Sequence, residues 1–298
     1  MDIIKDSFQK STRRAGGGFH PEISLADMQK VQLELLHELD RICRKNHLHY
    51  TLSSGTCLGA VRHQGFIPWD DDIDVYMSWK DAEKLAECQN QFRDKYFVQS
   101  YKTDPKFSST HYRLCDSTTS CFMKDTEGLD INHGIFIDIY IYYLYPDSRF
   151  MKKKITVDSF ILRVLVANTH PKNHGKLVAF LGDMVLKFYK GKKRERKIES
   201  ILREYKGNSW EKYVATYFGR DIGLGKCIKY PKEWFVHPKI LCFEDMEVPC
   251  PGNPEEYCRL QYGNTFMKLP PVEKRQPHHE FIYASVSESY KDFKGIYY

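Results

Sequence analysis

The sequence lacks several features that mark common classes of protein. None of its apolar runs reaches the roughly 18 residues that a membrane-spanning helix needs. Its nine cysteines form no Cys-x-x-Cys pair and are odd in number, so reduced thiols are expected rather than a disulfide framework. No secretory leader is evident after Met1. We therefore expect a cytoplasmic protein without a transmembrane segment.

The sequence also lacks a large excess of either charge, since it has 45 Lys and Arg and 39 Asp and Glu, a formal net charge of +6. This small excess suits an anionic substrate or an anionic membrane without choosing between them. No aromatic-basic recognition motif is present, so nucleic acid is not an expected partner. A zinc site at Cys242, Cys250 and Cys258 with His237 is disfavoured, because the spacing matches no standard zinc pattern. The 298 residues, 42% of them hydrophobic, suffice for one large domain or two small ones.

The most informative stretch holds an acidic run, Asp70, Asp71, Asp72 and Asp74. From Asp72 onward polar and apolar residues alternate, which predicts a strand with the carboxylates of Asp72 and Asp74 on one face. Carboxylates so close together repel unless a cation lies between them. Mg²⁺, or alternatively Mn²⁺, is the hard ion that prefers such oxygen ligands. A calcium loop of the EF-hand type is excluded, since Val75 stands where that loop needs glycine.

Small residues precede the acidic run. Ser53–Thr56 predicts a turn-forming loop, and Cys57–Arg62 predicts a short helix whose N–H groups point back at that loop. An anion placed there meets free donors and the positive end of the helix dipole. A metal ion beside a loop that holds phosphates indicates a phosphoryl- or nucleotidyl-transfer site.

A third carboxylate lies within an apolar stretch that predicts a strand, residues 134–143. Asp138 is surrounded there by isoleucines and a phenylalanine. A buried lone carboxylate is costly unless it is paired or binds a metal. The alternative is an edge strand on which Asp138 faces water.

Residues 55–74 read GTCLGAVRHQGFIPWDDDID, and this stretch resembles the signature of the LicD family. These proteins are phosphocholine transferases of bacterial surface glycans, related to fukutin and fukutin-related protein, within the nucleotidyltransferase superfamily. Further matches are Phe136–Ile139, Tyr262–Gly263, Leu269–Pro271 and Glu273–Arg275. The resemblance spans most of residues 25–279, and a motif of this length is highly specific.

The resemblance implies an α+β fold, a nucleotidyltransferase-like mixed sheet flanked by helices, with a helical insert and a C-terminal segment. It implies transfer of phosphocholine from CDP-choline to a hydroxyl of a cell-surface glycan precursor of the teichoic acid, lipopolysaccharide or capsule type. Two alternatives stay open. One is transfer of another CDP-linked group, such as glycerol phosphate or ribitol phosphate. The other is a non-catalytic scaffold associated with the membrane.

The resemblance also assigns roles to residues. Asp72, Asp74 and Asp138 are the expected catalytic residues and metal ligands. The expected donor phosphate-binding residues are Ser54, Gly55, Thr56 and Arg62. Possible accessory groups around the pyrophosphate are Asp70, Lys268, Arg275, His278 and His279.

Aromatic faces are the usual partners of a quaternary ammonium, by cation–π attraction. Strand alternation places Tyr76 on the face of Asp72 and Asp74, and Tyr140 on the face of Asp138. Together with Trp69 they are the head-group candidates. The alternative is that these rings belong to the core or its rim.

Four regions are expected: a polar tail at 1–23, a catalytic core at 24–145, a helical insert at 146–215 and a C-terminal segment at 216–298. The insert ends in a basic run, Lys190–Lys197. Such a run is either a solvated face or a contact with an anionic membrane. With a lipid-linked glycan as acceptor, the second interpretation places the protein at the inner face of the membrane.

Overall fold

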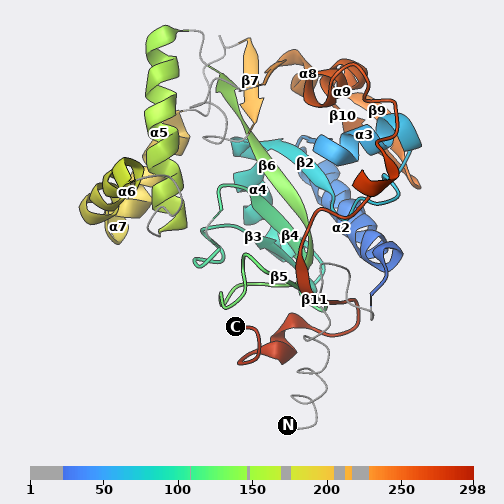
Figure 1. Ribbon diagram of the computed structural model, residues 1–298, viewed down its shortest axis with the longest axis horizontal. Helices are drawn as coiled ribbons and strands as arrows, with labels where there is room; N and C mark the ends of the chain where they lie inside the picture. The colour runs from blue at the N-terminus through green and yellow to red at the C-terminus, as the bar shows by residue number, and fades with distance from the viewer. Residues whose placement is uncertain (1–22, 108, 146–147, 169–175, 205–211, 217–227) are drawn as a thin grey trace.

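The computed structural model describes residues 23–298 except 108, 146–147, 169–175, 205–211 and 217–227. A mixed sheet lies at its centre, with the strand order β1-β2-β6-β4-β3, and β7 and β8 extend it from β6. These strands are β1 Tyr50–Leu52, β2 Asp74–Ser78, β3 Tyr96–Gln99, β4 Tyr112–Asp116, β6 Ile135–Tyr145, β7 Tyr213–Thr216 and β8 Lys229–Pro231. Helices flank the sheet (Figure 1). The expected α+β class is therefore confirmed.

The long strand β6 lies inside the sheet, as the β-branched residues at alternate positions of Ile135–Ile141 favour. It runs parallel to β2, with Asp74 opposite Asp138. On its other side it runs antiparallel to β4, with Arg113 opposite Asp138. Residues directly opposite each other on neighbouring strands project to the same face. Asp74, Asp138 and Arg113 therefore share one face of the sheet.

The helix α2, Leu25–Asn46, packs against the sheet. It begins at a capping box, in which the Asp27 backbone N–H donates to Ser24 Oγ over 3.1 Å. Its apolar residues recur at helical spacing and are fully buried: Leu35, Leu36, Leu39 and Ile42. The helix predicted over Ser24–Lys45 is confirmed.

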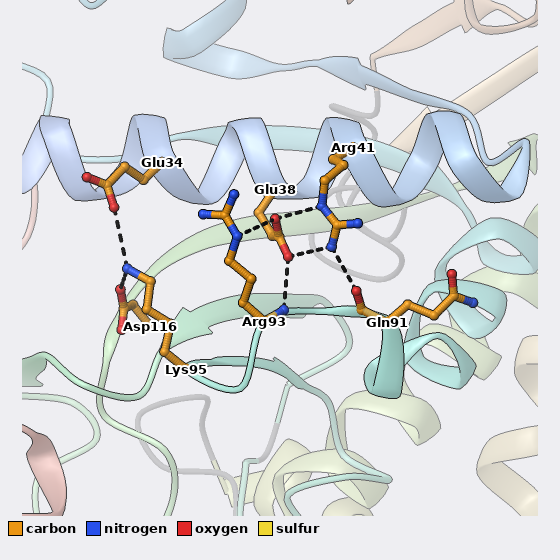
Figure 2. A network of polar contacts seen from close by, with 7 residues as sticks. All are labelled: Glu34, Glu38, Arg41, Gln91, Arg93, Lys95 and Asp116. Atoms are coloured by element: carbon orange, nitrogen blue, oxygen red, sulfur yellow. Dashed lines mark hydrogen bonds and ion pairs between the residues drawn. The ribbon is translucent and has the colours of Figure 1, made fainter.

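Polar contacts also hold α2 in place (Figure 2). Glu38 is buried, and its carboxylate accepts hydrogen bonds from Arg41 Nε at 2.9 Å and from the Arg93 backbone N–H at 3.0 Å. Lys95 links α2 to β4, because its Nζ lies 3.4 Å from Glu34 Oε2 and 2.7 Å from Oδ2 of the buried Asp116. These contacts hold α2 against β4 and against the segment that precedes β3.

The segment around the predicted loop differs from expectation. The helix α3 runs Ser54–His63, so Ser54–Thr56 form its first turn instead of a separate loop. Ser54 has φ 45°, a left-handed conformation that side chains rarely adopt. The helix α4, Trp79–Glu87, follows β2 directly, and the short 3₁₀ helix η1, Gln89–Gln91, comes after it.

The described residues of the insert form the helices α5 Arg149–Ala167, α6 Lys176–Phe188 and α7 Lys192–Glu204, and its last residues enter β7. Both α6 and α7 pack against α5, and the three lie together at one side of the molecule (Figure 1). Over the described ranges, no helix has the length and apolar character needed to cross a bilayer.

The C-terminal region folds back over the sheet (Figure 1). Its strand β11, Phe281–Ser285, pairs with β5, Ser120–Met123, from the first half of the chain. The other elements are α8 Glu233–Val236, β9 Lys239–Phe243, β10 Met246–Cys250, α9 Pro254–Tyr262, η3 Val272–Lys274 and η4 Tyr290–Phe293. The expected tail at 1–23 lies outside the described residues apart from Ile23, which is buried. The domain boundaries stay predictions.

Candidate active site

The acidic run lies between α3 and β2. Asp70, Asp71 and Asp72 precede the strand, and each offers a carboxylate oxygen within 4.8 Å of those of the other two. Asp74 is the first residue of β2 and is buried opposite Asp138. The fold thus gathers five carboxylates at one end of the parallel β2–β6 pair.

Burial and the negative charges of neighbouring carboxylates disfavour the ionisation of several of these carboxyl groups. Burial, and then the charges of Asp72 and Asp71, raise the pKa of Asp70 to about 8. Burial is also the main cause that raises the pKa of Asp72 to about 6 and that of Asp74 well above its ordinary value. A bound cation removes this penalty, so the cluster favours one.

Asp138 is the exception on the same face. Its Oδ1 lies 2.8 Å from Arg113 Nε and 3.2 Å from His111 Nε2. Burial alone would raise its pKa, but Arg113 and His111 hold that pKa well below the ordinary value. The Arg113 guanidinium also stacks over the Phe136 ring at 3.7 Å. Asp138 is therefore an ionised carboxylate with an oxygen already paired.

Sequence reasoning missed Arg113. The signal was a cationic residue between Tyr112 and Leu114 of a predicted strand, which needs an anion as partner if it is buried. Which strand supplies that anion depends on the pairing of β4 with β6, and this pairing is not evident from the sequence.

The C-terminal segment holds Asp71. Its carboxylate accepts hydrogen bonds from the backbone N–H groups of His278 at 3.1 Å and His279 at 3.0 Å. His279 Nδ1 lies a further 3.2 Å from Asp71 Oδ1. Burial would raise the pKa of Asp71, but these donors keep it below the ordinary value. Two predicted accessory residues, His278 and His279, thus meet the acidic run at its middle carboxylate.

The helix α2 holds the backbone of the same run from another direction. Gln29 Nε2 donates to the Asp70 carbonyl and Gln32 Nε2 to the Asp71 carbonyl, each over 2.8 Å. Sequence reasoning missed both glutamines. Gln32 lies on the apolar face of an amphipathic helix, where an amide side chain needs a polar partner.

The first turn of α3 lies against the acidic run. Thr56 Oγ1 accepts a hydrogen bond from the Asp74 backbone N–H over 2.8 Å. A Cβ added at Gly55 would lie 2.6 Å from Asp70 Oδ2, so only glycine allows this close approach. The Ser54 backbone N–H donates to the Tyr257 hydroxyl at 3.0 Å. Gly55 and Thr56 thus position the carboxylates directly.

Two predicted basic residues bind the protein's own C-terminal loop. Arg62 Nη1 donates to the carbonyls of Phe266, at 2.8 Å, and Lys268, at 3.4 Å. Arg275 Nε donates to the Pro270 carbonyl at 2.9 Å. Lys268 itself has an exposed side chain. The phosphate-binding role of Arg62 stays a prediction.

The three head-group candidates occupy different environments. Trp69 is partly buried, with the Arg275 guanidinium 5.5 Å above its ring. Tyr76 has no exposed surface and packs edge-on against Tyr140, with 6.5 Å between ring centroids. Tyr140 is partly exposed, and its ring also lies 5.1 Å from that of His111. Tyr140 thus contacts His111, which is itself paired with the Asp138 carboxylate.

Comparison with known proteins identifies the family. Residues 47–161 match the family described as LicD/FKTN/FKRP, nucleotidyltransferase domain. The match contains α3, the acidic run, β2 and β6. This chain carries a nucleotidyltransferase domain of the LicD/FKTN/FKRP family. It is a LicD-family transferase, as the signature at residues 55–74 predicted.

The LicD similarity extends beyond the domain. The chain is 28% identical over 269 residues to the lipopolysaccharide cholinephosphotransferase LicD of Haemophilus influenzae, covering 87% of this chain and 97% of that protein. It is 32% identical over 117 residues to an uncharacterized protein of Rickettsia prowazekii, covering 39% and 41% of the two chains. An uncharacterized protein of Rickettsia typhi is 40% identical over 60 residues, covering 20% and 19%.

Proposed function

We propose that this LicD-family transferase moves phosphocholine from CDP-choline to a hydroxyl of a cell-surface glycan precursor. The observation that supports it most is the similarity to the Haemophilus influenzae cholinephosphotransferase, which extends over nearly the whole of both chains. The precursor is of the teichoic acid, lipopolysaccharide or capsule type and is carried on a lipid. The protein then works in the cytoplasm, at the inner face of the membrane.

The residues of the acidic run fit a divalent metal ion. Asp74 Oδ1 is buried and has no hydrogen-bond partner among the residues that the structure describes, which suits a ligand atom whose partner is a cation. The neighbouring carboxylates supply the oxygen donors that Mg²⁺ or Mn²⁺ prefers. Asp72 and Asp74 would hold the ion, with Asp70 beside them and Asp138 as the third predicted ligand. When bound, the ion would neutralise charge on the donor pyrophosphate.

The chemistry is a displacement at the phosphorus that carries choline. The acceptor oxygen forms a bond to this phosphorus, the bond to the bridging oxygen breaks, and CMP leaves. The proton of the acceptor hydroxyl passes to a carboxylate oxygen of the acidic run. The first turn of α3, Ser54–Thr56, presents its helix N-terminus to the donor phosphates. Asp71 has a different role, because the C-terminal segment already donates hydrogen bonds to its carboxylate.

Transfer of another CDP-linked group, such as glycerol phosphate or ribitol phosphate, is the second candidate. Tyr76 is fully buried and Arg275 covers the Trp69 ring, so two of the three candidate rings are poorly placed to bind choline. This observation favours retaining the second candidate. It also leaves Tyr140 as the candidate ring best placed to meet a quaternary ammonium.

Donor competition tests the proposal. Labelled CDP-choline is bound to the full-length protein with Mg²⁺ and displaced with CDP-choline, CDP-glycerol or CDP-ribitol. The proposal predicts that unlabelled CDP-choline displaces the label at the lowest concentration. Preference for CDP-glycerol or CDP-ribitol overturns the choline assignment and selects the second candidate. Equal displacement by CDP alone shows that no head group is recognised.

A further inference from the structure

The helix α6 exposes an apolar stripe. Its large side chains are Leu177 and Phe180, 70% and 60% exposed, Leu181 and Met184, 42% and 41% exposed, and Phe188, 62% exposed. At 100° per residue these five positions fall within one sector of the helix about 100° wide. The stripe runs the full length of the helix, so it is a continuous surface rather than scattered side chains.

The opposite side of α6 is already used. Gly182 is buried there, and the helix packs against α5 on this side. The exposed stripe therefore faces away from the helix partner that the insert provides. The helix also exposes Lys176, Asp183 and Lys187, so its outer side is amphipathic, with the apolar stripe bordered by charged residues. A continuous exposed apolar surface with a polar border marks an interaction site.

Lysines border the end of this stripe. Lys187, Lys190, Lys192 and Lys193 are all exposed, and they cluster where α6 ends and α7 begins. The turn between the two helices is made at Gly191, with φ 49°. Lys192 and Lys193 lie in the first turn of α7, where the helix dipole disfavours positive charge. Their position serves a contact with an anion better than it serves the stability of the helix.

We propose that the α6 stripe and these four lysines form a docking surface for an anionic membrane. The apolar side chains would enter the boundary between headgroups and acyl chains, and the ammonium groups would meet anionic headgroups. The 13 residues of α6 extend about 20 Å, which suits a helix lying in the plane of the surface. The four lysines favour an anionic lipid surface over a purely apolar protein partner. They also disfavour a second copy of the protein, because the lysines of two facing copies would repel each other. The proposal does not depend on the transferred group.

Vesicle sedimentation tests the apolar part. The full-length protein is mixed with vesicles of phosphatidylcholine alone or with added phosphatidylglycerol, without donor. The wild type is expected to sediment with the anionic vesicles. The double variant Phe180→Ser, Phe188→Ser should lose this binding by about tenfold or more. Both rings are largely exposed, so the variant should keep its helical circular dichroism. The control is Val236→Ser, Ile240→Ser, two residues that are 53% exposed elsewhere and should sediment like the wild type.

Charge reversal tests the basic part. Lys187→Glu, Lys190→Glu should release the protein from anionic vesicles by about tenfold or more. Lys80→Glu, Lys84→Glu, which makes the same change in net charge on α4, should leave the binding unchanged. Equal sedimentation of the two charge variants overturns the proposal. A second result would also overturn it. If the wild type binds no vesicles and is a dimer by sedimentation velocity, while the Phe180→Ser, Phe188→Ser variant is a monomer, then a second copy of the protein covers the stripe.

Discussion

Glu38 and Asp74 are both buried carboxylates, but one meets cationic groups and the other meets carboxylates. Burial would raise the pKa of Glu38, yet Arg41 and the Arg93 backbone hold it below its ordinary value (Figure 2). Asp74 has its pKa raised by burial and by Asp72, and within the described part of the chain its Oδ1 has no hydrogen-bond partner. The charge of Glu38 is balanced by groups within the protein. Asp74 lies among other carboxylates, so we expect a bound cation to balance its charge.

Replacing Asp74 should produce the largest difference between the two regions. Asp74→Asn is expected to reduce transfer by about 100-fold or more, because it removes a ligand charge next to the donor. The melting temperature should be unchanged or higher, since the Thr56 hydrogen bond goes to the backbone of residue 74 and a like charge is lost. CMP release and thermal unfolding measure the two effects. EDTA should act on the wild type as the substitution does.

The exposed Asp125 supplies a control for this change. Asp125→Asn should keep both activity and melting temperature. Full activity of Asp74→Asn, or of the wild type in EDTA, would rule out the metal mechanism.

Asp71 belongs to the acidic run, but the C-terminal segment already donates hydrogen bonds to its carboxylate, so removing that carboxylate should lower the stability of the protein. Asp71→Ala leaves two backbone N–H groups and His279 without their acceptor. We expect about 3 kcal/mol lower free energy of unfolding, measured in urea. Trypsin should also cleave faster at Lys274 and Arg275 in the released segment. Unchanged cleavage and stability would show that this segment is held by other contacts.

Glu38→Gln should lower stability by about 1–2 kcal/mol at pH 7 and leave the transfer rate nearly unchanged. The lowered pKa of folded Glu38 means that its contribution is complete above the ordinary value of 4.5 and is lost as the pH falls through the folded value. The difference between wild type and variant, measured by urea unfolding, should therefore shrink from pH 7 to pH 3. A difference that stays constant over this range would contradict the assignment of the charge.

The smallest expected effect concerns the head group. Tyr140→Ala should weaken CDP-choline binding by about tenfold, the loss of one cation–π contact, and CDP binding much less. Tyr140→Phe keeps the ring and should be mild. If all three ligands, CDP-choline, CDP and CTP, lose affinity equally, Tyr140 supports the strand and does not contact choline.

The sequence predicted those features that depend on local pattern. The α2 helix follows from a capping box and helical spacing, and the β2 and β6 strands follow from alternation and isoleucine content. The signature at residues 55–74 led to the family, because its length makes chance unlikely to produce it. The pairing of β2 with β6 places Asp74 opposite Asp138, so two of the three expected metal ligands lie on adjacent strands.

What escaped prediction depends on contacts between distant segments. Arg113 and Asp138 are 25 positions apart, and His279 and Asp71 are 208 apart. Each pair required the tertiary fold, as did the approach of Gln32 to the acidic run. The first turn of α3 was mistaken for a loop, since small residues favour turns, whereas Ser54 starts the helix from a left-handed conformation. The metal ligands and the phosphate-binding residues stay predictions.

The Mg²⁺ dependence of CDP-choline binding tests the central claim most directly. Equilibrium dialysis of labelled CDP-choline against the full-length wild type, with Mg²⁺ or with EDTA, compares the two states, and Asp74→Asn with Mg²⁺ supplies the matched variant. A carboxylate cluster that needs a cation predicts tight binding only for the wild type with Mg²⁺, because without the ion the acidic run repels the pyrophosphate. Equal binding in Mg²⁺ and in EDTA would contradict that account.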